Sequence, residues 1–110
     1  MNPLDLIHEI IATYQRHGWQ LRRVLLRTET RAALSASTEV CANASMQEAA
    51  IDALWFARAA SGGREAWELR LISAQQYALF EAFESDESEE DREEVRHEME
   101  NRMREYVTSA

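Results

Sequence analysis

The segment 51–72 constrains the fold of this chain more than any other. Residues 51–58 (IDALWFAR) are almost entirely apolar, residues 65–72 (EAWELRLI) alternate between apolar and polar, and a Ser-Gly-Gly turn signal at 61–63 separates them. Two such runs around a glycine turn are typical of a β-hairpin. An isolated two-stranded sheet is marginally stable in water. The hairpin therefore needs at least one further strand and helices to cover it.

The same region also allows a second interpretation. Ser45 and Glu48 form a capping-box pattern, and the alanines that follow favour a helix over 46–60. A strand at 65–72 would then lack its neighbour in the hairpin, and for this reason the hairpin is preferred. Residues 35–50 are rich in Ala, Ser, Thr and Asn, and we expect a loop there.

The N-terminal third predicts a helix, a strand and a short helix. In residues 2–17 apolar side chains recur at helical spacing, and Gly18 stands where a helix would end. Residues 19–27 follow this glycine directly with an apolar centre, which favours a strand. Residues 28–34 then predict a short helix with a threonine as its cap.

The C-terminal third predicts two helices. Residues 73–83 begin with a second capping-box pattern and carry aromatic residues around most of a helix circumference. An acidic connector follows, and Ser88 can cap a last helix with a narrow apolar stripe formed by Val95, Met99, Met103 and Tyr106. The expected fold class is therefore α+β. It is a single small domain of about three strands (one strand plus a β-hairpin), packed with an N-terminal helix and two C-terminal helices. A core domain would span residues 1–84, and the connector and amphipathic helix would span residues 85–110.

Length, cysteine content and hydropathy exclude several classes of protein. A chain of 110 residues can bury one modest core. A single cysteine, Cys41, excludes an internal disulfide and a cysteine-based zinc site. No apolar run approaches the roughly 18 residues of a membrane span. We expect a cytoplasmic protein that binds no cofactor and no membrane.

The charge distribution argues against nucleic acid as a partner. The net charge is −8, and residues 81–110 account for all of it with twelve acidic and four basic residues. A chain of this charge repels a polyanion at long range. The basic stretch in the neutral part is expected to be a solvated face or a docking site for the acidic tail; it comprises Arg16, Arg22, Arg23, Arg27 and Arg31.

One group of residues offers an enzymatic alternative. Asp52, with Glu68 and Arg70 on the next predicted strand and Glu9 on the first helix, resembles the core of PD-(D/E)xK nucleases. That resemblance implies a metal-dependent nuclease-like enzyme in which two carboxylates share one Mg²⁺. If Ala60 faces Arg64, however, the two acids share a face about 13 Å apart, at roughly 3.3 Å per residue. Shifting the register by one residue puts them on opposite faces, and neither arrangement lets them share a metal.

The last helix is the best candidate for binding. Its narrow stripe, Val95, Met99, Met103 and Tyr106, would suit docking to another protein or to a second copy of this chain. Packing on the sheet of its own domain is an equally good interpretation. Small size, low pI and an amphipathic C-terminal helix are similar in general character to bacterial type III secretion chaperones, whose motifs are absent here. The expected function is a non-catalytic, acidic protein-interaction module.

Overall fold

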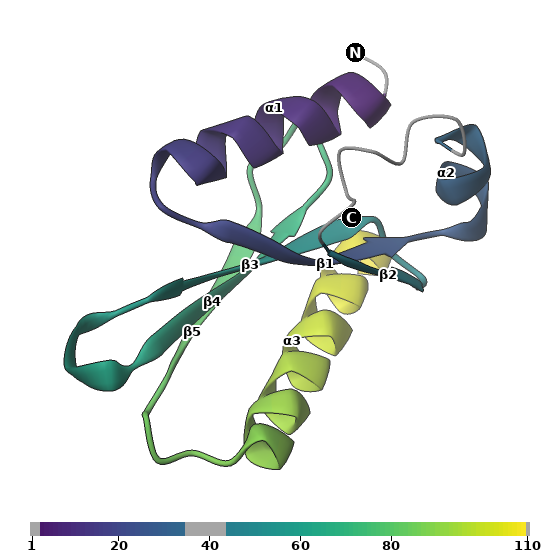
Figure 1. Ribbon diagram of the computed structural model, residues 1–110. Helices are drawn as coiled ribbons and strands as arrows, with labels where there is room; N and C mark the ends of the chain where they lie inside the picture. Colours follow the sequence, from purple (N-terminus) through teal and green to yellow (C-terminus); the bar gives the residue numbers. More distant parts are fainter. Residues whose placement is uncertain (1–2, 35–43, 110) are drawn as a thin grey trace.

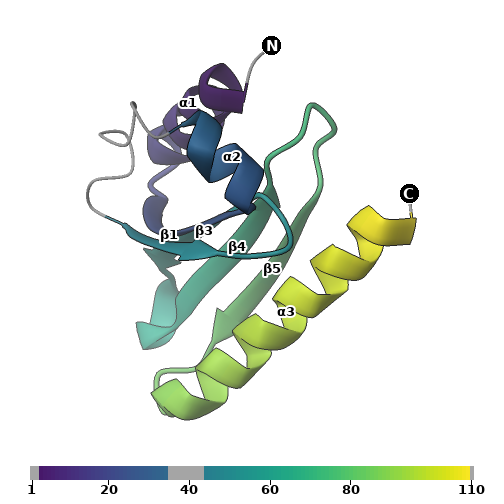
Figure 2. The same cartoon turned by 90° about the vertical axis from the view of Figure 1, so that its right-hand side faces the viewer.

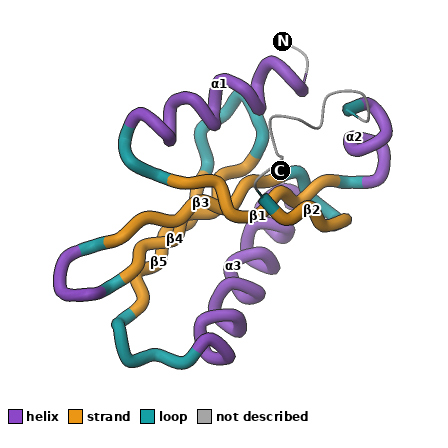
Figure 3. Tube along the Cα trace, viewed as in Figure 1, coloured by secondary structure: helices purple, strands orange, loops and turns teal. Residues whose placement is uncertain are grey.

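A computed structural model describes residues 3–34 and 44–109, which form one five-stranded mixed sheet with helices on both of its faces (Figures 1 and 3). The strand order is β2-β1-β3-β4-β5, with β1 and β2 parallel and the other pairs antiparallel. The elements are α1 (Pro3–Arg16), β1 (Gln20–Leu26), α2 (Thr28–Ala33), β2 (Ser45–Glu48), β3 (Ala53–Ala59), the 3-10 turn η2 (Ser61–Gly63), β4 (Glu65–Leu71), β5 (Ala78–Phe83) and α3 (Glu89–Ser109).

Both faces of the sheet are covered by helices, α1 on one and α3 on the other (Figure 2). This explains why residues 53–57 of β3 are a continuous apolar run, since successive side chains of a strand point to opposite faces. Leu54 and Phe56 pack with α1, whereas Ala53, Trp55 and Ala57 belong to the core under α3. None of the helices in the described residues is long and apolar enough to cross a bilayer.

Several elements agree with the sequence analysis. The first helix, the strand after Gly18 and the short helix form where expected, and Gly18 has the positive φ of 84° that favours glycine. The expected cap was wrong, because Thr28 is the first residue within the short helix, its hydroxyl donates to Glu48, and Arg27 takes the N-cap position without a side-chain cap. Residues 53–71 form the predicted hairpin, not the alternative helix. Its register pairs Phe56 with Glu68, and the amide of Ala60 donates to the carbonyl of Arg64 at 2.9 Å.

The expected fold was wrong in its number of strands and helices. Residues 78–83 form strand β5 and not a helix, so one helix follows the hairpin instead of two. The Ser73–Gln76 pattern caps nothing, because residues 72–75 form bends and β5 pairs with β4 from Ala78 to Phe83. Residues with good helix propensity are held extended there by tertiary pairing, which overrides propensity. The loop expected over 35–50 contains β2 at 45–48, while Cys41 lies outside the described residues.

α3 packs on the sheet through a stripe of apolar side chains and is held there by ion pairs as well. Ser88 caps it as expected, because its hydroxyl accepts a hydrogen bond from the amide of Asp91 at 3.1 Å. Arg23 of β1 forms a two-pronged ion pair with Glu93 at 2.8 and 3.0 Å. At Arg23, therefore, the basic stretch contacts the acidic C-terminal part of the chain, as one of the two expectations for it had it.

The Arg23–Glu93 ion pair is expected to make the stability of the fold depend on pH in the acidic range. Hydrogen bonds from Arg23, and secondarily from Arg96, lower the pKa of Glu93 from 4.5 to about 2. A carboxylate with a lowered pKa stabilises the fold above pH 4.5, and this contribution is lost as the pH falls toward 2. Since Glu93 is partly exposed, we expect the contribution to stay below about 1 kcal/mol. In urea unfolding from pH 6 down to pH 2.5, Glu93→Gln should flatten the pH dependence. An unchanged slope would contradict this assignment.

Candidate functional site

The structure places the stripe of the last helix against its own sheet. Met99 and Met103 are 2% and 0% exposed in the core under α3. Val95 is partly buried on the same core, and Tyr106 stacks on Tyr77 with ring centroids 3.7 Å apart. A partner could reach Met99 and Met103 only after α3 had left the sheet, and the role of all four side chains in partner binding stays a prediction.

The three residues of the nuclease-like alternative lie on the face covered by α1, but the two acids have separate partners. The Asp52 carboxylate accepts hydrogen bonds from the Arg27 amide and the Thr30 hydroxyl, both at 2.8 Å. The Glu68 carboxylate accepts one from the Tyr14 hydroxyl. Because Asp52 pairs with Ile72 and Glu68 with Phe56, the acids stand about 13 Å apart along the strands. No group of three or more metal-ligating side chains occurs in the described ranges, and the geometry gives the nuclease alternative no support.

Strand β5 forms one edge of the sheet and leaves its outer side open (Figure 3). The amide of Leu71 donates to the carbonyl of Tyr77 at 3.0 Å, and this fixes which residues of β5 bond to β4. In an antiparallel pair alternate residues bond inward, so the main-chain groups of Ala78, Phe80 and Ala82 point away from the sheet. Nothing in the described part of the chain hydrogen-bonds to these groups.

Phe80 is the most exposed large apolar side chain of the described residues, at 56%. It pairs with Glu68 and therefore lies on the α1 face of the sheet. α1 covers β1 and β3 on this face and leaves the β5 side uncovered (Figure 2). The ring of Trp19 meets Phe80 edge-on, with centroids 6.4 Å apart, and is its only described aromatic contact.

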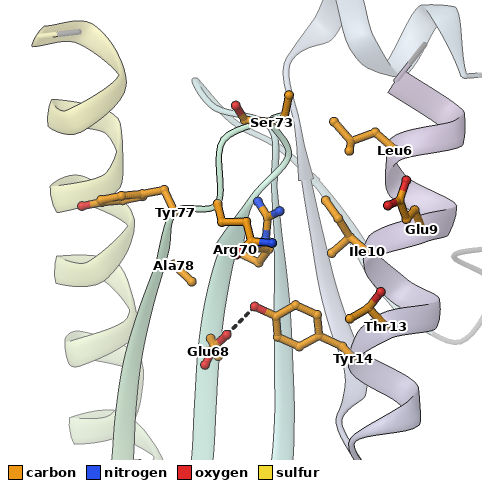
Figure 4. Close-up of a pocket in the computed structure, with 12 residues that line it drawn as sticks. Leu6, Glu9, Ile10, Thr13, Tyr14, Glu68, Arg70, Ser73, Tyr77 and Ala78 are labelled. Atoms are coloured by element: carbon orange, nitrogen blue, oxygen red, sulfur yellow. Dashed lines mark hydrogen bonds between the residues drawn. The ribbon is translucent and has the colours of Figure 1, made fainter. Parts of the chain in front are cut away.

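A cavity of about 460 Å³ opens beside β5, between α1, β4 and the loop at 72–77 (Figure 4). Its walls include Glu9 and Tyr14 from α1, Glu68 and Arg70 from β4, and Ser73 from the loop. Tyr14 stacks on Phe56 with ring centroids 4.1 Å apart and donates its hydroxyl to Glu68. Burial, together with this bond to a carboxylate, raises the pKa of Tyr14 well above its ordinary value. Tyr14 is thus a neutral donor on this wall.

Sequence reasoning missed β5 and the cavity for identifiable reasons. In the predicted helix at 73–83 Phe80 would be largely buried, whereas on β5 it is exposed. Residues 78–83 (ALFEAF) show no clear alternation of apolar and polar side chains, so this segment carries little strand signal of its own. The three tryptophans belong to the two cores: Trp55 and Trp67 pack under α3, and Trp19 packs under α1.

The comparisons with known proteins supply no relative. No protein-family model, no curated protein and no solved structure matches this chain. The functional argument therefore rests on the residues of this chain.

Proposed function

We propose that this protein is a non-catalytic interaction module of the cytoplasm that binds an extended segment of another protein. The segment would lie beside β5 and add a further strand to the sheet. The outward main-chain groups of Ala78, Phe80 and Ala82, which have no hydrogen-bond partner in the described part of the chain, carry this proposal. Strand addition to an open edge uses such groups for affinity and nearby side chains for specificity.

The side chains of β5 indicate that a partner strand would make one main apolar contact, with Phe80. On the α1 face, Phe80 stands between two alanines, so a strand beside it meets a large ring flanked by small residues. Phe80 has more than half of its surface free for this contact. Native proteins usually protect an exposed apolar edge with charges, proline or a covering segment. Covering this edge with a partner strand would remove both the open main-chain groups and the exposed ring.

The charge around β5 favours a basic partner segment. Glu81 lies within the strand, and Glu84 directly after it has a 60% exposed side chain. The connector continues with further acidic residues, and the chain as a whole carries −8. Opposite charge accelerates encounter and selects among partners. A segment rich in Arg or Lys is therefore expected at this edge.

The experiment is selection of peptides from a random decapeptide library on the immobilised protein. Enriched peptides should carry basic residues, and their dissociation constants are then measured by fluorescence anisotropy. Phe80→Ala should weaken binding about tenfold or more, as loss of a contact anchor does. Ala82→Pro should have a similar effect because it removes an outward N–H, whereas every inward bond to β4 remains. Bound peptide should also slow amide hydrogen exchange at Phe80.

The matched control is Val107→Ala, which removes the other exposed large apolar side chain of the described residues, on α3. It should leave peptide affinity unchanged. Peptides that bind all four proteins equally, or a library that yields no specific binder, would overturn the proposal. Light scattering adds a distinct outcome. A dimer of the wild-type protein that Ala82→Pro converts to a monomer would assign this edge to a second copy instead.

A further inference from the structure

Arg70 is a buried cation that strand addition at β5 does not use. Its side chain is on the α1 face of β4, and Figure 4 shows it extending toward α1 on the wall of the cavity. Arg70 is 8% exposed. Its Nη1 donates to the carbonyl oxygens of Leu71 and, at 3.5 Å, of Gln75. Within the described ranges, no carboxylate oxygen lies within 4.0 Å of its guanidinium, and Nε and Nη2 have no hydrogen-bond partner.

The chain's other buried arginine shows the usual way of holding such a charge. Arg96 is 1% exposed, and its Nη1 donates to Glu89 at 2.6 Å and to Glu93 at 2.8 Å. A buried charge without such compensation is costly, and buried charges are normally paired. Arg70 lines a cavity and forms no direct ion pair with a described residue, so a bound carboxylate is expected to pair with it.

The form of the guanidinium indicates the group that would bind. Its planar fork of N–H donors matches the two oxygens of a carboxylate in a bidentate pair. Because Nη1 donates to backbone carbonyl oxygens, the N–H groups of Nε and Nη2 are the donors that remain for a ligand. The neutral Tyr14 hydroxyl is already committed to Glu68 and leaves Arg70 as the anion-binding group of the cavity.

The other charges of the cavity restrict the ligand further. Glu68 and the exposed Glu9 also line it, so the wall carries two carboxylates for one guanidinium. A plain anion would meet a net negative surface, whereas a molecule with both a carboxylate and an ammonium group would match both signs. The volume of about 460 Å³ is at the small end of the range for ligand sites, roughly 300–1,000 Å³.

We propose that this cavity binds a small zwitterion of the amino-acid class. The carboxylate would pair with Arg70 and the ammonium group would face Glu9, on the opposite wall in Figure 4. This site is separate from the outer edge of β5, and the proposal is independent of strand addition there.

The test is thermal unfolding of the full chain with each common free α-amino acid at about 10 mM, together with propionate, ethylamine and inorganic phosphate. At least one amino acid should raise Tm by about 3 °C or more, as a ligand above its Kd does. Propionate, ethylamine and phosphate should not. Arg70→Met should abolish the shift, and Glu9→Gln should reduce it. Ala82→Pro, which alters the β5 edge, should leave it unchanged.

Ligand-free stability supplies a second readout. Because no carboxylate of the described residues lies within 4.0 Å of the Arg70 guanidinium, Arg70→Met should leave Tm unchanged or higher in the absence of ligand. Glu9 is exposed, so its variant should fold in either case. The proposal is overturned by a panel in which no amino acid stabilises the wild-type protein, or by equal stabilisation from propionate or phosphate. A fall of more than about 5 °C for ligand-free Arg70→Met would also overturn it, since Arg70 would then be a structural residue.

Discussion

A chain that stops after Glu84 is expected to be insoluble or unfolded. α3 covers a continuous apolar face of the sheet, and its removal would expose large side chains that are now buried. Three of these, Trp55, Trp67 and Phe83, are at most 7% exposed in the intact protein. Exposed apolar patches of more than a few hundred Å² promote association and aggregation. Solubility, near-ultraviolet circular dichroism and thermal unfolding of the truncated chain measure the effect.

The control for this truncation is a chain that stops after Tyr106. The described residues that it loses, 107–109, are exposed, and it should therefore unfold cooperatively near the wild-type temperature. A soluble, cooperatively unfolding chain that ends at Glu84 would contradict the prediction. It would mean that α3 is detachable, and the stripe of Val95, Met99, Met103 and Tyr106 would then be free to bind a partner.

Replacement of Arg96 by alanine is expected to cost about 2–4 kcal/mol of unfolding free energy, comparable to truncating a large core side chain. The guanidinium lies 3.9 Å from the centroid of the Trp67 ring and 5.3 Å from that of Phe83. The alanine variant loses these cation–π contacts and leaves space under α3. Its acidic partners, Glu89 and Glu93, are 71% and 37% exposed, so water can solvate them after the change. Most of the loss therefore comes from packing.

Arg96→Met separates packing from charge. Methionine keeps an unbranched apolar stem and removes the buried Nε, which has no hydrogen-bond partner in the described structure. It should recover at least half of the stability lost in the alanine variant. Arg102→Ala, an exposed change on the same helix, should stay within about 0.5 kcal/mol of wild type. Urea unfolding measures all three variants, and equal effects of Arg96→Ala and Arg102→Ala would show that Arg96 is not part of the core.

Local sequence patterns predicted those parts of the fold that are determined by neighbours in the chain. Gly18 and the turn at 61–63 mark the ends of elements, and these positions were correct. The turn left two hairpin registers open, and the structure has the one that pairs Phe56 with Glu68. β5 could not be predicted in this way. Its residues favour a helix by propensity, and they are strand because β4 offers an unpaired edge on that side.

The candidate sites could not be predicted for the same reason: they are formed by residues that come together only in the folded chain. The sequence singles out Arg70 only as part of a short nuclease-like pattern. The proposal that it binds a ligand depends on its surroundings in the folded protein. The cavity, and the lack of a direct ion pair for Arg70 within the described residues, are properties of the assembled sheet and α1. Phe80 likewise becomes an exposed edge residue only once β5 is placed beside β4.

The position of α3 also has a consequence for synthesis of the chain on the ribosome. All five strands precede α3 in the sequence, so the sheet can begin to pair before its second cover exists. Until residues 89–109 emerge, the face with Trp55 and Trp67 is open to water and to other nascent chains. Transiently exposed apolar surface of this kind makes folding intermediates prone to aggregation. A strongly acidic connector made immediately beforehand gives the unfinished chain a net negative end, which helps to keep such chains apart until α3 closes over the sheet.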